Sequence, residues 1–221
     1  MKLFLQSFSK LIFTVIVLSV LLFLPAGTFA YAGGWRFIGL MCGMMCILGV
    51  LLLFFNPELL KKRLQAKEKQ AEQKSVVLFS GLMFIAVFVL AGLDFRFGWS
   101  YMPMWLVFAG CVLLVLSYIG FAEVLRENTY LSRTVEVQQG QQVVSSGLYG
   151  IVRHPMYTVI SLLYLSMPFV LGSYWALLPL ALYPPIIMHR ILAEERLLCK
   201  ELVGYKEYTS NVRFRLIPGL W

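Results

Sequence analysis

Four long apolar runs limit what this chain can fold into. They cover residues 8–30, 37–55, 75–93 and 104–122, and few charged residues interrupt them. A helix of about 20 apolar residues is long enough to cross a hydrocarbon core of about 30 Å. A backbone inside lipid must satisfy its own hydrogen bonds, which favours helices over irregular structure. We therefore predict an all-α, polytopic membrane protein.

The composition and the second half of the chain extend this prediction. The chain is 60% hydrophobic with a mean hydropathy of +0.79, whereas soluble domains average about 45–50% apolar residues. Two shorter apolar stretches, Pro155–Leu171 and Trp175–Met188, precede an amphipathic stretch over residues 191–208. We expect about five to six transmembrane or membrane-inserted helices. Residues 1–122 would form a transmembrane scaffold. Residues 123–221 would form the functional region, which consists of a loop, a kinked helical hairpin, and a C-terminal amphipathic helix and tail on the cytoplasmic side.

The basic residues alternate with the apolar runs. Of the 19 Lys and Arg residues, 17 lie at or before residue 10, between residues 61 and 74, between residues 126 and 153, or beyond residue 189. Positive charge gathers on the cytoplasmic side of membrane proteins. We therefore predict an integral protein of the plasma (inner) membrane with both termini in the cytoplasm. The net charge of +8 then reflects topology and attraction to anionic membrane lipids, and it does not indicate nucleic-acid binding.

Two loops carry local predictions. Residues 129–148 alternate polar and apolar side chains around Gly140, which indicates a hairpin-like loop. In the short turn between the third and fourth runs, Asp94 and Arg96 are close enough in sequence to form an ion pair.

Four prolines fall within the last two apolar stretches, at positions 168, 179, 184 and 185. Each removes a backbone donor and bends a helix. Broken helices are tolerated in membranes where they line a cavity. We therefore predict a lateral gap between these helices and the fourth span, open to a lipophilic molecule from the bilayer.

No metal centre is predicted. The four cysteines lack the spacing of a metal site or of a disulfide framework, and the chain has two histidines. Cys42 and Cys46 share a helix face within an apolar run, a pattern more typical of packing than of ligation.

Two charge clusters stand at the predicted membrane border. The first is the motif Arg153-His154-Pro155-x-Tyr157, and the second is Arg190 followed by Glu194-Glu195. The residue before proline avoids helical geometry, so His154 should lie at a helix boundary. In a helix starting near Tyr183, Arg190 and Glu194 lie one turn apart and can pair.

The two carboxylates cannot both serve one arginine. Glu195 lies about 100° around the helix from Glu194, so one of them is left for another cation, from the protein or from a ligand. Ionisable groups at a membrane border are expensive and are functional-site candidates. A ligand with a zwitterionic amino-acid moiety would suit the cluster. A salt-bridge network that holds the last helices together would equally explain it.

These motifs resemble the integral-membrane isoprenylcysteine carboxyl methyltransferase family and its phospholipid methyltransferase relatives. The resemblance covers about residues 123–221 and rests on the Arg-His-Pro-x-Tyr motif, the paired glutamates, Tyr205-x-x-Tyr208 and the closing segment Val212–Pro218. It implies S-adenosylmethionine as methyl donor. It also implies a lipophilic acceptor, either an isoprenylcysteine-like carboxylate or a lipid.

The resemblance also implies roles for individual residues. The residues implied to bind the cofactor are His154, Pro155, Tyr157, Glu194, Glu195, Tyr205 and Tyr208. One glutamate would face the donor's ammonium group. Arg153, Arg190 and Arg213 are the candidate catalytic residues, and Arg213 and Arg215 would help to position cofactor or acceptor.

Two other classes of protein share part of the pattern. Membrane sterol reductases that use NADPH resemble the same C-terminal region, but they typically carry Gly-Glu shortly after the tyrosine. This chain has Thr158-Val159-Ile160 there, which favours methyl transfer. A non-catalytic lipid-binding membrane protein is the third possibility.

Overall fold

The computed structural model describes residues 2–64, 71–131 and 137–221. In chain order, its elements within those residues are α1 (Lys2–Ala26), α2 (Ala32–Phe55), α3 (Pro57–Leu64), α4 (Ala71–Phe97), α5 (Met104–Glu127), the 3₁₀ helix η1 (Gly147–Gly150), α6 (Pro155–Leu171), α7 (Leu177–Leu180), α8 (Tyr183–Glu201) and α9 (Tyr205–Asn211). Helices α1, α2 and α5, and α4 from Lys74 onward, are long and apolar enough to cross a membrane. The prediction of an all-α, polytopic membrane protein is confirmed.

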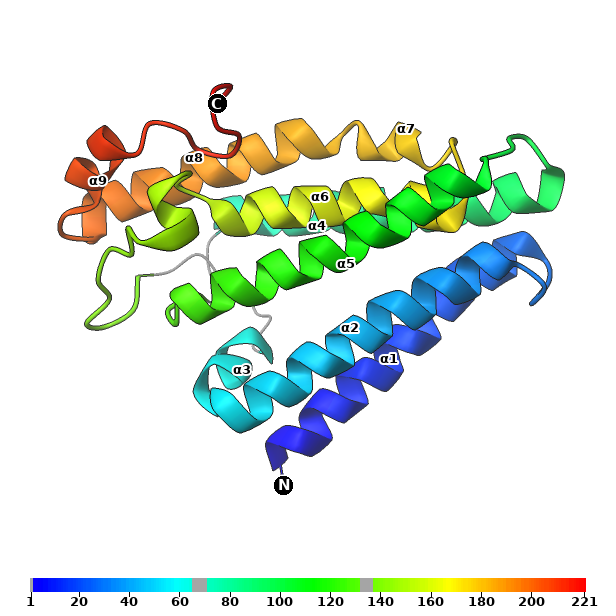
Figure 1. Cartoon of the computed structure of the whole chain (residues 1–221), viewed down its shortest axis with the longest axis horizontal. Coiled ribbons are helices and arrows are strands. Elements are labelled where there is room, and N and C mark those ends of the chain that lie inside the picture. The colour runs from blue at the N-terminus through cyan, green and yellow to red at the C-terminus, as the bar shows by residue number, and fades with distance from the viewer. Residues whose placement is uncertain (1, 65–70, 132–136) are drawn as a thin grey trace.

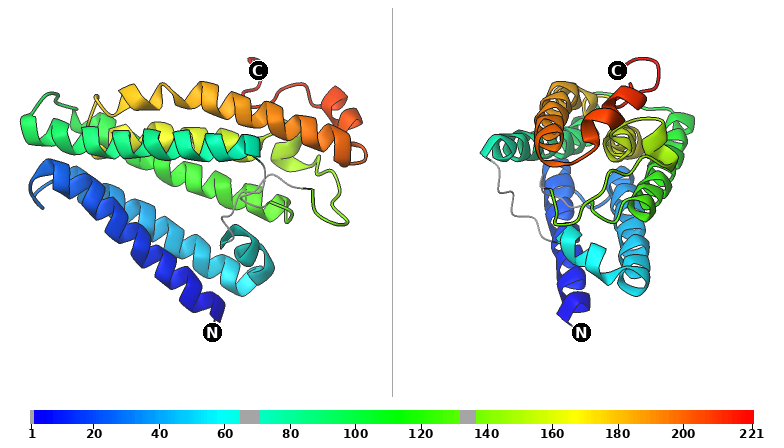
Figure 2. Two further views of the ribbon diagram at one scale, coloured as in Figure 1. Left: turned by 180° about the vertical axis from the view of Figure 1, so that it is seen from behind. Right: turned by 90° about the vertical axis from the view of Figure 1, so that its left-hand side faces the viewer.

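The long helices run between two ends of the molecule (Figure 1). Residues 27–31, 98–103 and 172–176 connect helices at one end, which we call the turn end. The start of α1, the end of α5 and α9 lie toward the other end, which we call the pocket end. Helices α4, α5, α6 and α8 lie together, whereas α1 and α2 form a hairpin that diverges from them toward the pocket end (Figure 2).

The side chains of α1 and α2 are buried only where these helices lie close to the rest of the protein. The buried residues of α1 run from Leu18 to Ala26, and those of α2 run from Gly33 to Ile38, so both helices are buried near the turn end. Gly33 allows the closest approach, because a Cβ there would lie 2.3 Å from the carbonyl oxygen of Leu171. The α1–α2 hairpin is therefore fixed to the end of α6.

A buried carboxylate ties the turn end together. Asp94 is 2% exposed and accepts hydrogen bonds from the backbone N–H of Ser100 (2.8 Å) and its hydroxyl (2.6 Å). The hydroxyl of Ser173 also donates to it. In this turn Arg96 instead lies over the Phe97 ring, 5.5 Å from its centroid. The predicted Asp94–Arg96 pair is wrong, because three neutral donors satisfy the carboxylate from other directions.

Helices α5 and α6 pack closely over their length. A Cβ on Gly110 would lie 2.5 Å from Cβ of Phe169, and one on Gly120 would lie 2.9 Å from Cγ1 of Val159. The predicted gap between the fourth span and these helices is therefore wrong along α6. Pro184 acts differently from the prediction, because it lies in the first turn of α8, where a missing N–H has no helical partner, whereas Pro168 lies inside α6.

Replacing Gly110 with alanine is expected to destabilise the protein by about 1–3 kcal/mol, because the added methyl group collides with backbone and Cβ atoms of α6. The matched control is Gly43→Ala in α2, where an added Cβ meets nothing within 4 Å. Melting temperatures in detergent should fall for the first variant and hold or rise for the second. Equal melting temperatures would contradict the close α5–α6 contact.

Two predicted segments differ in the structure: the hairpin-like loop over residues 129–148 and the amphipathic stretch over residues 191–208. The first arm of the predicted hairpin-like loop falls largely on residues 132–136, which lie outside the described residues. In the described part a turn is present, in which the N–H of Gln141 donates to the Gln138 carbonyl oxygen (3.0 Å), but residues 141–145 form no strand. The amphipathic stretch predicted over 191–208 is divided: α8 continues through Glu201, and Gly204 (φ +85°) begins a separate α9.

Candidate functional site

A cavity of about 100 Å³ lies at the pocket end. Its walls come from the loop after α5, the start of α6, the second half of α8 and α9. Seven of the residues named from the sequence line it: Arg153, His154, Tyr157, Arg190, Glu194, Tyr205 and Tyr208. The chain therefore brings together both charge clusters and the tyrosine pair in one place.

The Arg-His-Pro motif is held by the C-terminal segment. The backbone N–H groups of Arg153 and His154 donate to the carbonyl oxygens of Phe214 and Arg215, both at 2.9 Å. His154 is the residue before α6, with non-helical backbone angles, and Pro155 occupies the first helical position. The predicted boundary at His154 is confirmed, and it leaves the imidazole at the junction of loop, helix and C-terminal segment.

Glu194 forms part of the cavity wall. The hydroxyl of Tyr157 donates to Oε2 of Glu194 (2.5 Å) and accepts a hydrogen bond from Nε of Arg190 (2.9 Å). The tyrosine thus bridges Arg190 and Glu194, the two residues expected to lie one turn apart on the same helix. This chain of contacts fixes the carboxylate of Glu194 beside the cavity.

Glu195 occupies a different environment, and it is not among the residues lining the cavity. Its Oε1 lies 3.1 Å from Nε of Arg153 and 3.3 Å from Nε2 of His154. Its Oε2 accepts a hydrogen bond from Nε of Arg215 at 2.8 Å. The residue is 8% exposed, so a buried carboxylate joins α8, the motif before α6 and the C-terminal segment.

The ionisation of Glu195 follows from these contacts. Burial opposes the charged form, but hydrogen bonds from His154 and Arg215, together with the nearby charge of Arg153, outweigh it and lower the pKa of the carboxyl below its ordinary value. The two glutamates therefore have separate surroundings. Glu195 is occupied by cations of the protein, and Glu194 faces the cavity.

The two tyrosines of α9 also differ. The hydroxyl of Tyr208 donates to the carbonyl oxygen of Tyr149 (2.7 Å), and burial raises the pKa of Tyr208 to about 12. The hydroxyl of Tyr205 is buried and has no hydrogen-bond partner among the described residues. A buried polar atom without a partner is costly, so a hydroxyl of this kind at a cavity wall suits a ligand.

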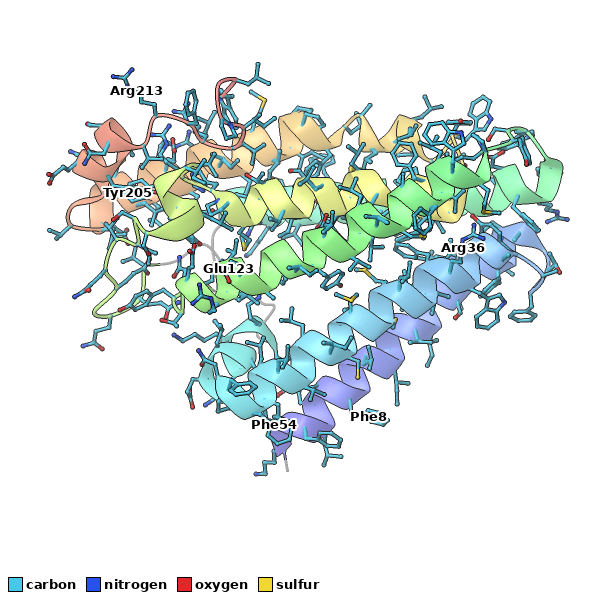
Figure 3. The ribbon with its side chains drawn as sticks, viewed as in Figure 1. Phe8, Arg36, Phe54, Glu123, Tyr205 and Arg213 are labelled. Atoms are coloured by element: carbon cyan, nitrogen blue, oxygen red, sulfur yellow. The ribbon has the colours of Figure 1, made fainter. Side chains whose placement is uncertain are left out.

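Four of the residues named from the sequence do not line the cavity: Pro155, Glu195, Arg213 and Arg215. Pro155 is buried at the start of α6 and shapes the backbone, while Glu195 lies behind the wall. The side chain of Arg213 is exposed and points away from the protein (Figure 3). The structure therefore does not bring Arg213 to the cavity, whereas Arg215, two residues later, reaches Glu195.

Other residues that line the cavity do not belong to the motifs singled out in the sequence. Asn128, Tyr130 and Met156 line it, together with residues 141–144. Asn128 directly follows α5 as its C-terminal cap, and its side-chain amide donates to the hydroxyl of Tyr149 (3.0 Å). Residues 141–144 carry no signal in the sequence beyond the polar alternation already noted.

Comparison with known proteins supports the resemblance. Residues 106–200 match the model of the isoprenylcysteine carboxyl methyltransferase (ICMT) family. The matched region contains α6, α8 except for its last residue, the Arg-His-Pro-x-Tyr motif and both glutamates, and it ends before α9. None of the curated proteins compared with the chain matches it.

Proposed function

We propose, from the membership of residues 106–200 in the isoprenylcysteine carboxyl methyltransferase family, that this membrane protein uses S-adenosylmethionine to methylate a lipophilic acceptor. The observation that carries the proposal is the composition of the cavity wall. Glu194 presents a carboxylate, Arg153 and Arg190 present guanidinium groups, and the buried hydroxyl of Tyr205 has no partner among the described residues. This set complements the ammonium and carboxylate groups of an amino acid.

The size of the cavity suggests which part of the donor it holds. Sites for whole drug-sized ligands are about 300–1,000 Å³, whereas this cavity is about 100 Å³. We therefore assign the amino-acid end of the donor to the enclosed space. Glu194, oriented by Tyr157, would bind its ammonium group, and the arginines would bind its carboxylate.

When bound, S-adenosylmethionine supplies a methyl group on a sulfonium, and its transfer to a carboxylate oxygen forms a C–O bond as the S–C bond breaks. A carboxylate acceptor needs no general base, so the main work of the protein is alignment, which can contribute about 7–11 kcal/mol in favourable cases. Helices α6 and α8 hold Tyr157, Arg190 and Glu194 on regular backbone, which suits such alignment.

We also propose that the pocket end faces the cytoplasm of a plasma (inner) membrane, with both termini on that side. The basic residues of α3 (Lys61, Lys62 and Arg63) and of the region after α5 support this orientation. In this arrangement the donor enters from water and the acceptor enters from the bilayer.

The function is tested by incubating the purified protein with methyl-tritiated S-adenosylmethionine and N-acetyl-S-farnesylcysteine. Methyl transfer should place label in the organic phase as a base-labile ester. A protein that instead oxidises NADPH in the presence of a sterol would favour the reductase class. A protein that does neither, and binds neither S-adenosylmethionine nor NADPH, would favour the non-catalytic class.

Tyr205→Phe is expected to weaken S-adenosylmethionine binding by about twofold to tenfold, the value of a neutral hydrogen bond. Its hydroxyl has no partner among the described residues, so the ligand-free melting temperature should hold or rise. The matched control is Tyr208→Phe, which loses the bond to Tyr149 and should melt earlier. Unchanged donor affinity for Tyr205→Phe would move the donor away from this hydroxyl.

A further inference from the structure

The last residue of α5 holds the chain just before the Arg-His-Pro motif. Oε2 of Glu127 accepts a hydrogen bond from the backbone N–H of Leu148 at 3.0 Å. Leu148 belongs to η1, which ends at Gly150, shortly before Arg153. A carboxylate accepts a stronger hydrogen bond than a neutral oxygen does. This contact therefore ties the short helix η1 to α5, one of the helices long enough to cross a membrane.

Gly147 provides the space that the carboxylate occupies. A Cβ at this position would overlap Oε1 of Glu127. The backbone of Gly147 is also left-handed (φ +53°), a conformation that glycine adopts without the steric cost of a side chain. The carboxylate of Glu127 thus lies directly against bare backbone at the start of η1, where a side chain would displace it.

Asn128, the next residue, holds η1 at a second point. Its side-chain amide donates to the hydroxyl of Tyr149 (3.0 Å), and its Oδ1 accepts a hydrogen bond from the N–H of Tyr130 (3.0 Å). The carbonyl oxygen of Tyr149 in turn accepts a hydrogen bond from Tyr208 of α9. Asn128 and all three tyrosines line the cavity, so the end of α5 holds this part of the wall together through η1.

Glu127 differs from Asn128 because it is not among the described residues that line the cavity. Its connection to the site passes through the backbone of η1. The N–H of Val152 donates to the carbonyl oxygen of Leu148 at 3.2 Å, so the residue that Glu127 holds is bonded to the residue directly before Arg153. Because α5 also packs closely against α6, the segment before the motif and the helix after it are fixed to the same helix.

We propose that Glu127 is a positioning residue of the donor site, which sets the position of Arg153 through η1. This inference rests on the proposed function, in which the arginines bind the carboxylate of the donor's amino-acid end. The cavity is about 100 Å³, so the charged groups on its wall must be placed to fit one small ligand. Without the contact from Glu127, η1 and Arg153 move relative to Glu194, and the two charges no longer match the two ends of one amino acid.

The first test removes either the positioning residue or the donor's carboxylate. Glu127→Ala is expected to raise the Kd for S-adenosylmethionine about tenfold, because a charge-assisted hydrogen bond between Arg153 and the donor is lost. The Kd for decarboxylated S-adenosylmethionine should match that of the wild type. Glu127→Gln, which keeps an oxygen that can accept the hydrogen bond from Leu148, should recover most of the affinity. The matched control is Glu123→Ala, one turn earlier on α5, where the carboxylate pairs with Arg126 and the donor Kd should not change.

A purely structural role for Glu127 makes a different forecast. It would lower the melting temperature and leave the donor affinity of the folded protein unchanged, or it would weaken the binding of both compounds equally. Glu127→Asp keeps the charge on a side chain that is one methylene shorter. This variant should show the same selective loss, and it serves as the test if Glu127→Ala does not fold.

The second test uses the space shared with Gly147. Gly147→Ala is expected to lower the melting temperature and the donor affinity of the wild type, because its methyl group displaces the carboxylate of Glu127. In a Glu127→Ala background the methyl group has room, so the same substitution should cost less, and its remaining cost reflects the left-handed backbone. Strictly additive effects of the two substitutions would contradict the contact.

Two results of the first test would overturn this inference and leave the proposed function standing. One is an unchanged donor Kd in folded Glu127→Ala and Glu127→Asp, and the other is an equal loss of affinity for the donor and for its decarboxylated form. A wild-type protein that binds neither compound would overturn the proposed function itself.

Discussion

Glu195→Gln is expected to destabilise the protein by about 3–5 kcal/mol, the cost of removing one partner from a buried ionic cluster. The carboxylate lies against Arg153, His154 and Arg215, and the side chains of Arg153 and His154 are even more buried than that of Glu195. Glutamine fills the same volume but leaves the guanidinium charge of Arg153 uncompensated. The C-terminal segment should loosen first, because Arg215 belongs to it.

The measurement is thermal unfolding in detergent, compared with Glu207→Gln as a control on the exposed surface of α9. The Glu195 variant should melt well below the wild type, and the control should melt with it. Equal melting of all three proteins would show that the cluster contributes little to stability.

The same carboxylate predicts a pH dependence. Because the pKa of Glu195 is lower in the folded protein than its ordinary value of 4.5, ionisation of this group stabilises the fold above that ordinary value. The contribution is lost as the pH falls from there through the lowered pKa. Wild-type stability should therefore decline in this acid range, and Glu195→Gln should show a flatter decline. Parallel profiles would contradict the assignment.

The sequence predicted a helix well where a single local feature, such as a long apolar run or a proline, determines its position. Long apolar runs gave the four spans, and the residue before Pro155 gave the start of α6. Contacts between helices were less predictable, because they depend on distances that no single run encodes. Gly110 and Gly120 could not be recognised as the points where α5 and α6 meet, and Asp94 found serines from two loops instead of the arginine two residues away.

The candidate site was predictable in its residues and less so in their roles. Helical geometry indicated that Glu194 and Glu195 would face different partners, and the structure separates them in that way. Helical geometry could not indicate which glutamate faces the cavity. That depends on how the C-terminal segment packs against the residues just before α6. The same packing determines which arginine of the C-terminal segment is buried. It directs Arg215 toward Glu195 and leaves Arg213 in solvent.

Glu194→Gln should weaken S-adenosylmethionine binding by about tenfold to a hundredfold, because a charge-assisted hydrogen bond contributes about 1.5–3 kcal/mol. The fold should persist, since the glutamine carbonyl can still accept the hydrogen bond from Tyr157. Glu194 is also only partly buried, unlike Glu195. A role in structure alone would instead lower the melting temperature and leave donor affinity intact.

The most direct measurement is isothermal titration of the purified wild type and Glu194→Gln with S-adenosylmethionine and, separately, with NADPH. The account predicts that the wild type binds S-adenosylmethionine and not NADPH, and that Glu194→Gln loses most of this affinity while its melting temperature stays close to the wild-type value. Equal donor affinity in the two folded proteins, or binding of NADPH in place of the donor, would contradict it.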